Sequence, residues 1–262
     1  MSFLEDKYQK LARKDLSDFF NLQENKTKVF YSRQLEIMME NKYYHWITNR
    51  AVRDLIDSGE VISAQYNLNN AGSLKLIWNK SFRYYKRAAQ EICALVDEYS
   101  LPSLSADIGL RGETLVLEGF AMNGFNLLGR ETNIFKGKKW EESDHNLDFI
   151  FSKDNLNYGI EVKNMLGYMN YKELELKVKM CDYLDLIPIF AVRMFPQTWI
   201  NEVRDFGGFS LIMKYQFYPI SFKELAERVR NILNFPIGTP KRLEQGTMDR
   251  VLKWHQKNVN SK

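Results

Sequence analysis

The stretch HNLDFIFSKDNLNYGIEVKN, His145–Asn164, holds two short apolar segments, LDFIF and YGIEV, separated by polar residues. Their composition and spacing predict two strands joined as a β-hairpin. Each segment carries an acid where a buried strand normally has hydrocarbon, Asp148 in the first and Glu161 in the second. Residues i and i+2 share one face of a strand, so Glu161 and Lys163 point the same way, and an adjacent strand can lay Asp148 beside them.

The chemistry predicted for these residues is that of a hard divalent cation. The carboxylates of Asp148 and Glu161 and the backbone carbonyl of Val162 form an all-oxygen set of ligands. Magnesium prefers such ligands and keeps several waters, and manganese can substitute for it. Near a phosphodiester, Lys163 can orient or help to deprotonate the attacking water and offset negative charge in the transition state.

The segments around the hairpin predict an α/β domain with a mixed sheet between helices. In chain order they are a helix near Arg111 to Asn123, a strand over FNLLGRETN, a basic and mobile segment KGKKWEESDH, the hairpin, a helix over NYKELELKVKMCDYLDL, a buried strand over IPIFAVRMF, a strand within GGFSLIMKYQFYPI, and an amphipathic helix over SFKELAERVRNILNF capped by Ser221. The proline and serines of LPSLSAD predict a domain boundary before them, with residues 1–100 on one side and 101–262 on the other.

The spacing Glu-x-Lys alone has no specificity, because it occurs five times in the chain. Only the copy at Glu161 lies in an apolar strand that follows a strand headed by an acid. This context, from about Ser105 to Phe235, resembles the PD-(D/E)XK nuclease superfamily, the restriction-endonuclease-like fold.

The resemblance implies that Asp148 and Glu161 are metal ligands and Lys163 the catalytic lysine. Many members of the superfamily also carry a glutamate on the first helix, and Glu113 stands at that place. The sequence departs from the family pattern at Leu147, where the family has a proline. The alternative is a salt bridge between the acids and Lys163 at a sheet edge, without catalysis, or a degenerate nuclease fold.

Other catalytic chemistry has little support in the sequence. The three histidines, His45, His145 and His255, are scattered, which argues against a histidine metal cluster, although His145 is close enough to Asp148 to line the site. A phosphate-cradling G-x-x-x-x-G-K-[ST] loop is missing from the sequence, which disfavours ATP-driven action by this chain alone.

The region from Tyr31 to about Tyr85 predicts two close-coupled helices followed by a hairpin. The first helix covers SRQLEIMMEN, and the second begins with Thr48 as its N-cap and ends near Gly59. VISAQYNL and LKLIWNKSF then alternate as strands about the turn NNAGS. The order resembles a winged helix-turn-helix, with TNRAVRDLIDSGEVI as a recognition helix that runs into the wing.

The second of these helices has two distinct faces. The inward stripe is Ile47, Ala51, Val52, Leu55 and Ile56, and the outward residues are Asn49, Arg50, Arg53 and Asp54. Outward residues of this kind reach base edges and phosphates, and the wing supplies further cations for phosphate binding at Lys75, Lys80 and Arg83. An ordinary solvated helical face is the alternative.

Composition sets only broad limits on the protein class. The chain has 262 residues, 45% of them hydrophobic, and a net charge of +4, which allows a nucleic-acid partner without requiring one. The two cysteines, Cys93 and Cys181, lack metal-type spacing and are expected to be packing thiols. With no apolar run near the roughly 18 residues of a membrane span and a charged N-terminus, we expect a cytoplasmic protein without a membrane partner.

Together these observations predict a two-domain, Mg²⁺-dependent DNA endonuclease: a winged-helix module that binds double-stranded DNA and a nuclease domain that hydrolyses a phosphodiester. A Type II restriction endonuclease is favoured, and cutting both strands favours a homodimer. A junction-resolving or repair nuclease is the nearest alternative. A DNA-binding regulator with an inactive nuclease fold is the alternative from a different class.

Overall fold

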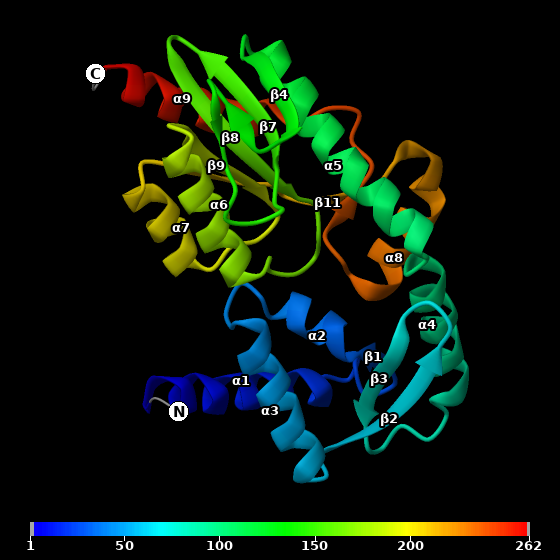
Figure 1. Cartoon of the computed structure of the whole chain (residues 1–262). Coiled ribbons are helices and arrows are strands. Elements are labelled where there is room, and N and C mark those ends of the chain that lie inside the picture. Colours follow the sequence, from blue (N-terminus) through cyan, green and yellow to red (C-terminus); the bar gives the residue numbers. More distant parts are fainter. Residues whose placement is uncertain (1–2, 261–262) are drawn as a thin grey trace. The chain divides into compact units, whose positions relative to one another are not determined.

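The computed structural model describes residues 3–260, which divide into two compact units (Figure 1). The first unit runs to Ser105 and also takes the later segment Glu224–Phe235. The second unit consists of Ala106–Lys223 and the residues from Pro236 onward. The sequence places everything after residue 100 in one domain, and the structure differs from that division in the segment 224–235. Among the described residues, no helix is long and apolar enough to cross a bilayer.

The first unit is a small antiparallel sheet packed between helices. Its elements are α1 (Phe3–Asn21), β1 (Val29–Tyr31), α2 (Ser32–Met38), α3 (His45–Asp57), β2 (Val61–Leu68), β3 (Gly72–Asn79), α4 (Lys86–Tyr99) and α8 (Lys223–Leu233). The strands lie in the order β1-β3-β2, and both pairings are antiparallel. Ile77 of β3 packs with α1 and α3 in one core, whereas the next residue, Trp78, stacks on Tyr85 beside α4. Alternation along β3 therefore buries both faces of this sheet.

The amphipathic helix α8 belongs to the first unit because its polar and apolar contacts are there. Arg228 forms an ion pair with Glu98 at the end of α4, at 2.9 Å. The side-chain amide of Gln34 in α2 donates to the backbone carbonyl of Ile232. An amphipathic pattern shows that a helix has an apolar face, and only long-range contacts decide which core that face joins.

Helix α3 starts earlier than its sequence predicts. Thr48 was expected as the N-cap, but the helix begins at His45, and Thr48 is fully buried inside it with no hydrogen-bond partner for its hydroxyl. Tyr44 and Trp46 stack at 4.5 Å around the true start of the helix. The packing of residues 45–48 therefore overrides the local capping preference of threonine. The predicted inward stripe is confirmed, with Ile56 partly buried and its other four members fully buried.

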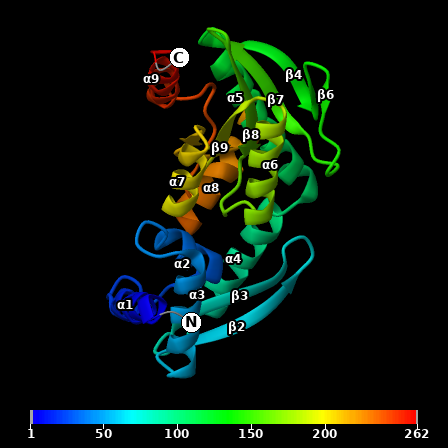
Figure 2. The ribbon, with the colours of Figure 1, turned by 60° about the vertical axis from the view of Figure 1, so that its left-hand side comes forward.

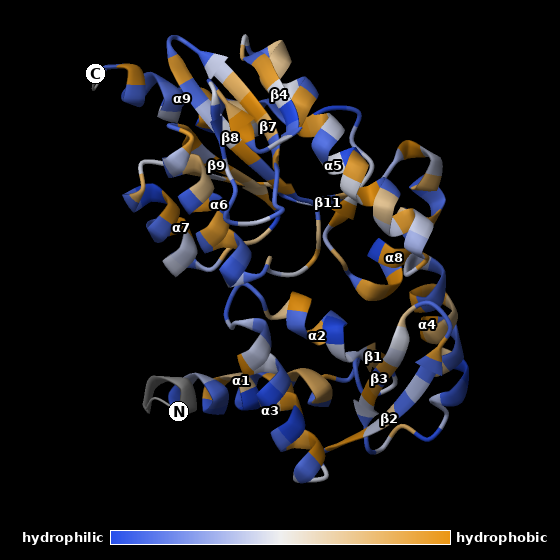
Figure 3. Ribbon diagram, viewed as in Figure 1, coloured by the Kyte–Doolittle hydropathy of each residue, from blue (hydrophilic) through white to orange (hydrophobic). Residues whose placement is uncertain are grey.

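The second unit is built on a five-stranded mixed sheet, which confirms the predicted α/β arrangement at that level. The strands are β4 (Asn126–Thr132), β7 (Leu147–Lys153), β8 (Leu156–Lys163), β9 (Ile187–Val192) and β10 (Phe209–Ile212). They lie in the order β10-β9-β8-β7-β4, in which β8, β9 and β10 are parallel and β7 and β4 are antiparallel to their neighbours. Hydrophobic residues concentrate on these central strands (Figure 3).

Helices cover both faces of this sheet (Figure 2). They are α5 (Pro102–Met122), α6 (Tyr171–Tyr183), α7 (Gln197–Asp205) and α9 (Gln245–Asn260). One core joins the sheet to α5 and α9, and two further clusters join the other face to α6 and α7. Helices α7 and α9 were not predicted from the sequence. Two short ribbons complete the unit: β5 (Ile134–Phe135) with β6 (Lys138–Lys139), and β11 (Gln216–Phe217) with β12 (Ile237–Gly238).

Two segments expected to be irregular have regular structure or long-range contacts. LPSLSAD forms the first turns of α5, because proline is accommodated at the first position of a helix, where its missing N–H costs nothing. Ser221, predicted as a helix cap, lies instead in a 3₁₀ turn, Ile220–Phe222. The basic segment KGKKWEESDH is anchored by the buried ring of Trp140 and by an ion pair of 2.5 Å from Lys138 to Asp185. The charges of the segment alone did not indicate these two contacts.

Candidate active site

The candidate active site lies where two adjacent strands of the sheet separate. β7 and β8 pair from the turn at Asp154 and Asn155, both at positive φ, as far as Phe149 opposite Ile160. Beyond that pair β7 stays with β4 and β8 stays with β9. The N–H of Val162 donates at 2.6 Å to the Asp148 carboxylate. A side-chain oxygen is thus placed at the fork in the sheet.

Glu161 lies beside this fork and is almost completely buried, with 2% of its surface exposed. One carboxylate oxygen accepts from Lys163 at 2.8 Å, so the two side chains share a face as the alternation predicts. The other oxygen is 2.5 Å from Lys177. Lys163 also contacts Glu173 of α6, at 2.9 Å. Both oxygens of Glu161 are therefore paired with lysines, in the middle of the sheet rather than at its edge.

Lys177 is the site residue that the sequence analysis missed. It lies on α6, is 4% exposed, and also donates to the backbone carbonyl of Asn146, just before β7. A signal was present in the sequence, because Lys177 falls within the apolar stripe formed by Leu174, Val178 and Cys181. A lysine in such a stripe needs a buried acid, since a lone buried ammonium is costly.

Asp148 is the residue of the site whose pKa is raised most clearly by its surroundings. Burial, followed by the negative charge of Glu161, raises its pKa from 3.8 to about 7, against the opposing effect of the Val162 N–H. Lys177 lowers this pKa and Glu113 raises it, so both lie within electrostatic range. The positive charge of Lys177 therefore acts on Asp148 less than burial and Glu161 do, whereas both oxygens of Glu161 are paired with lysines.

Glu113 reaches the same neighbourhood from α5. Its carboxylate is 3.8 Å from Arg130 of β4, and burial raises its pKa, with Arg130 opposing. The charges of Glu161 and Lys163 also act on Glu113. The structure thus gathers all four predicted catalytic residues, although Glu113 contacts Arg130 rather than the other acids.

The ligand set tests whether a metal fits here. Within residues 3–260 no group of three or more His, Cys, Asp or Glu side chains is arranged to hold a metal. Magnesium is commonly held by only one or two carboxylates with several waters. Asp148, whose carboxylate accepts from the Val162 N–H, and the nearby Glu161 fit that smaller set in donor type, with the carbonyl of Val162 as a third oxygen.

The three histidines lie apart. His145 is exposed, and His45 is buried in the first unit, where its ring contacts Arg33 at 3.1 Å. His255 of α9 is buried, with one ring nitrogen 2.6 Å from the Tyr158 hydroxyl and the other 2.9 Å from Asp154. The contacts of His255 with Tyr158 and Asp154 join α9 to the β7–β8 hairpin.

The DNA-binding candidates of the first unit separate into two groups. Asn49, Arg53 and Lys75 line one small hollow of about 70 Å³ with Ser32 and Val52. Lys80 and Arg83 are exposed, and Lys80 lies five residues beyond Lys75, roughly 17 Å along an extended chain.

Two residues of the outward face of α3 have partners within the unit. The amide of Asn49 donates to Glu36 at 2.9 Å, and Asp54 accepts from Gln9 at 2.7 Å, so Asp54 is held by α1. Arg50 is half-buried, whereas Arg53 is exposed. Among the cations of α3, Arg53 is therefore the better placed to reach a ligand.

Comparison of the chain with protein-family models, with curated proteins and with solved structures found no match.

Proposed function

We propose that the chain is a magnesium-dependent DNA endonuclease, whose second unit hydrolyses a phosphodiester and whose first unit binds double-stranded DNA. The observation that carries the proposal is the fork between β7 and β8, where Asp148 accepts from Val162 and where Glu161 and Lys163 pair on the adjoining face. Carboxyl groups with raised pKa values, Asp148 and Glu113, gathered with lysines suit a site that binds a cation and a phosphate.

In this proposal Asp148, Glu161 and the carbonyl of Val162 hold the metal, and Glu113 assists from α5. When bound, the metal supplies Lewis-acid polarisation of the phosphate and lowers the pKa of a bound water. The residues of the chain hold these oxygens in place. The backbone of β8 positions the carbonyl of Val162, and the contact with Lys177 positions the carboxylate of Glu161.

The role of Lys163 is electrostatic. Burial alone would lower its pKa, but the carboxylates of Glu161 and Glu173 raise it above the ordinary value. While these contacts persist, Lys163 stays protonated near neutral pH and is a poor general base. Its ammonium group instead orients the attacking water and offsets charge on the phosphate in the transition state.

The first unit supports the DNA-binding part of the proposal through its topology. Its element order, three helices interrupted by a short strand and followed by a two-stranded hairpin, is compatible with a winged helix-turn-helix. Arg53 and Lys75 meet in one hollow beside α3. Arginine and lysine placed there suit contacts to base edges and phosphates.

Among endonucleases, a Type II restriction enzyme acting as a homodimer is the role we favour, because a separate DNA-binding unit suits site-specific cutting. A repair or junction-resolving nuclease uses the same chemistry. Digestion of genomic DNA separates these roles, since a restriction enzyme produces discrete bands.

One observation favours a second candidate, a DNA-binding protein with an inactive nuclease fold. Both oxygens of Glu161 are already neutralised by Lys163 and Lys177, an arrangement that a purely structural ion-pair network also satisfies. A metal must compete with these two ammonium groups for the carboxylate.

Plasmid cleavage distinguishes the two candidates. The full chain is incubated with supercoiled plasmid in magnesium, in manganese and in chelator, and the ends are sequenced. We expect cutting with either metal and none in chelator. Lys163→Ala should abolish it, whereas Lys139→Ala, a change at an exposed lysine of β6, should not. A wild-type chain that binds DNA but never cuts it would establish the inactive alternative.

A further inference from the structure

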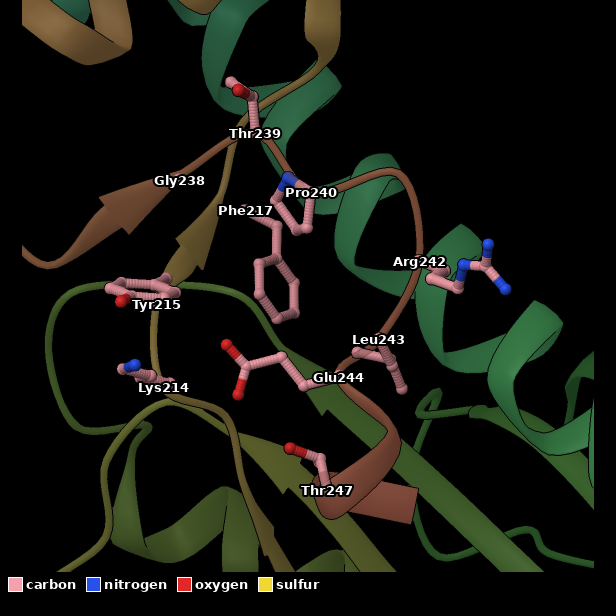
Figure 4. Close-up of a pocket in the computed structure, with 10 residues that line it drawn as sticks. All are labelled: Lys214, Tyr215, Phe217, Gly238, Thr239, Pro240, Arg242, Leu243, Glu244 and Thr247. Carbon is pink, nitrogen blue, oxygen red and sulfur yellow. The ribbon is translucent and has the colours of Figure 1, made fainter.

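A cavity of about 160 Å³ lies in the second unit, between β11 and the segment that leads from β12 into α9 (Figure 4). Its floor is buried and mostly apolar, with Phe217, Leu243 and the hydroxyl-bearing Thr247 each between 5% and 6% exposed. The rings of Tyr215 and Pro240 form its sides. The cavity thus combines a buried, mostly apolar floor with flat side walls.

The mouth of the cavity is charged. Lys214 and Glu244 lie at the opening, and the Glu244 carboxylate is directed toward Tyr215 and Phe217, whereas Arg242 points away (Figure 4). The Lys214 ammonium is 5.0 Å from the centre of the Tyr215 ring. A ligand that fits this cavity is flat and apolar on its faces, with a hydrogen-bond donor on one edge and a negative charge outside.

The walls of the cavity are fastened to the candidate active site. Asn164, the residue directly after Lys163, exchanges two hydrogen bonds of 2.7 Å with the backbone N–H and carbonyl of Phe217. On the other side Arg111, two residues before Glu113, donates at 2.5 Å to the carbonyl of Pro240. The cavity is therefore anchored to two of the three elements that carry the candidate catalytic groups, α5 and β8.

The size and chemistry of the cavity select one class of ligand. An apolar cavity of about 150 Å³ holds a benzene ring, so this one admits a flat aromatic ring system whose attached sugar stays at the mouth. Aromatic walls stack on bases without regard to sequence, and a carboxylate accepts from the amino group of adenine, cytosine or guanine. Lys214 can meet a flanking phosphate.

We propose that this cavity receives one unstacked nucleobase of the bound nucleic-acid strand, with an amino-bearing edge against Glu244. The inference rests on the proposed function, and it adds that the strand near the cleaved bond presents a single base to the second unit. Taking a base out of the stack costs a few kcal/mol, which is lowest at single-stranded or damaged positions.

The test measures base binding without cleavage. The full chain, in chelator, is titrated into a single-stranded oligonucleotide with a central 2-aminopurine, and separately into the 2-aminopurine nucleotide, whose fluorescence is quenched on stacking. We expect saturable quenching of both probes, with tighter binding of the oligonucleotide. Because the titration is made in chelator, this readout does not depend on catalysis.

Gly238→Leu is the blocking variant. A Cβ at Gly238 would lie 3.6 Å from the Tyr215 ring and 3.8 Å from Pro240, in ordinary contact, so a larger side chain extends into the cavity. Gly246→Leu is the matched control, because a Cβ there meets nothing within 4 Å. We expect Gly238→Leu to abolish quenching of the nucleotide and Gly246→Leu to preserve it.

If Gly238→Leu does not fold, Tyr215→Ala is measured in its place. It should weaken binding of the probe roughly five- to a hundredfold, the range for loss of one stacking partner. Unchanged quenching in the folded blocking variant, or in Tyr215→Ala, would overturn the proposal. So would quenching of the free nucleotide without any response from the oligonucleotide, since the cavity would then be a site for a small nucleotide. Quenching by a chain that never cuts DNA would support the base pocket and reject only the nuclease.

Discussion

Asparagine in place of Asp148 should stop cleavage and, at the same time, stabilise the fold at alkaline pH. Burial and the charge of Glu161 raise the pKa of Asp148 from 3.8 to about 7. A carboxyl group whose pKa is raised by folding binds its proton more tightly in the folded state. The folded state therefore loses stability as the pH rises from about 4 to about 7, and the loss persists above pH 7.

The size of this effect follows from the displacement of the pKa. It corresponds to at most about 4 kcal/mol at pH 8 and about 2 kcal/mol at pH 5, relative to an uncharged side chain. Asparagine has no ionisation penalty, and its side-chain oxygen can still accept the hydrogen bond from the Val162 N–H. The variant should therefore exceed the wild type in stability, and by more at pH 8 than at pH 5.

Urea unfolding followed by circular dichroism at pH 5 and pH 8, in chelator, measures the stability difference, and plasmid cleavage at pH 8 measures activity. Asp144→Asn is the matched control, because Asp144 is exposed and should change neither quantity. An Asp148→Asn variant that is less stable than the wild type at pH 8 would refute the electrostatic reasoning. Normal cleavage by the same variant would refute the assignment of Asp148 to the metal.

Three further predictions concern Lys177, the choice of metal and Arg53. Lys177→Met should cost roughly 3 to 5 kcal/mol in urea unfolding, because it leaves the buried Glu161 with one partner fewer; a loss below 1 kcal/mol would show that Lys163 alone suffices. Calcium should support DNA binding without cutting, and full activity in excess chelator would exclude the metal site. In gel shifts, Arg53→Ala should weaken the cognate site by roughly 1 to 3 kcal/mol and relax preference at one base pair, whereas Lys80→Ala should weaken all duplexes alike and lower the salt slope; identical behaviour of the two variants would remove Arg53 from base reading.

The hairpin that carries the candidate site could be derived from the sequence because its signals are local. Apolar alternation, the polar turn at Asp154 and Asn155, and the two-residue spacing of Glu161 and Lys163 all lie within twenty consecutive residues. The strand period then requires that Glu161 and Lys163 share a face, and their ion pair of 2.8 Å agrees. The mixed sheet could be predicted for the same reason, because the hydrophobic residues of each long segment repeat with the period of a strand or of a helix.

The sequence predicted less well which unit a helix joins and where a helix begins. Helix α8 has a clear amphipathic pattern, but its contacts with Glu98 and Gln34 assign it to a unit that begins more than a hundred residues earlier in the chain. Thr48 has the chemistry of a cap and lies inside a helix, because packing around Tyr44 moves the start of α3 upstream.

The sequence by itself determined which residue types stand on the two central strands and which of them share a face, since these properties depend on neighbours in the chain. Only the tertiary structure decided that β7 and β8 separate at Asp148, that Lys177 closes on Glu161 from α6, and that the cavity beside Phe217 exists. The physical reason is that separation of strands, pairing of buried charges and exclusion of water depend on surfaces brought together across the fold. The raised pKa of Asp148 is a property of that assembled environment and not of the aspartate itself.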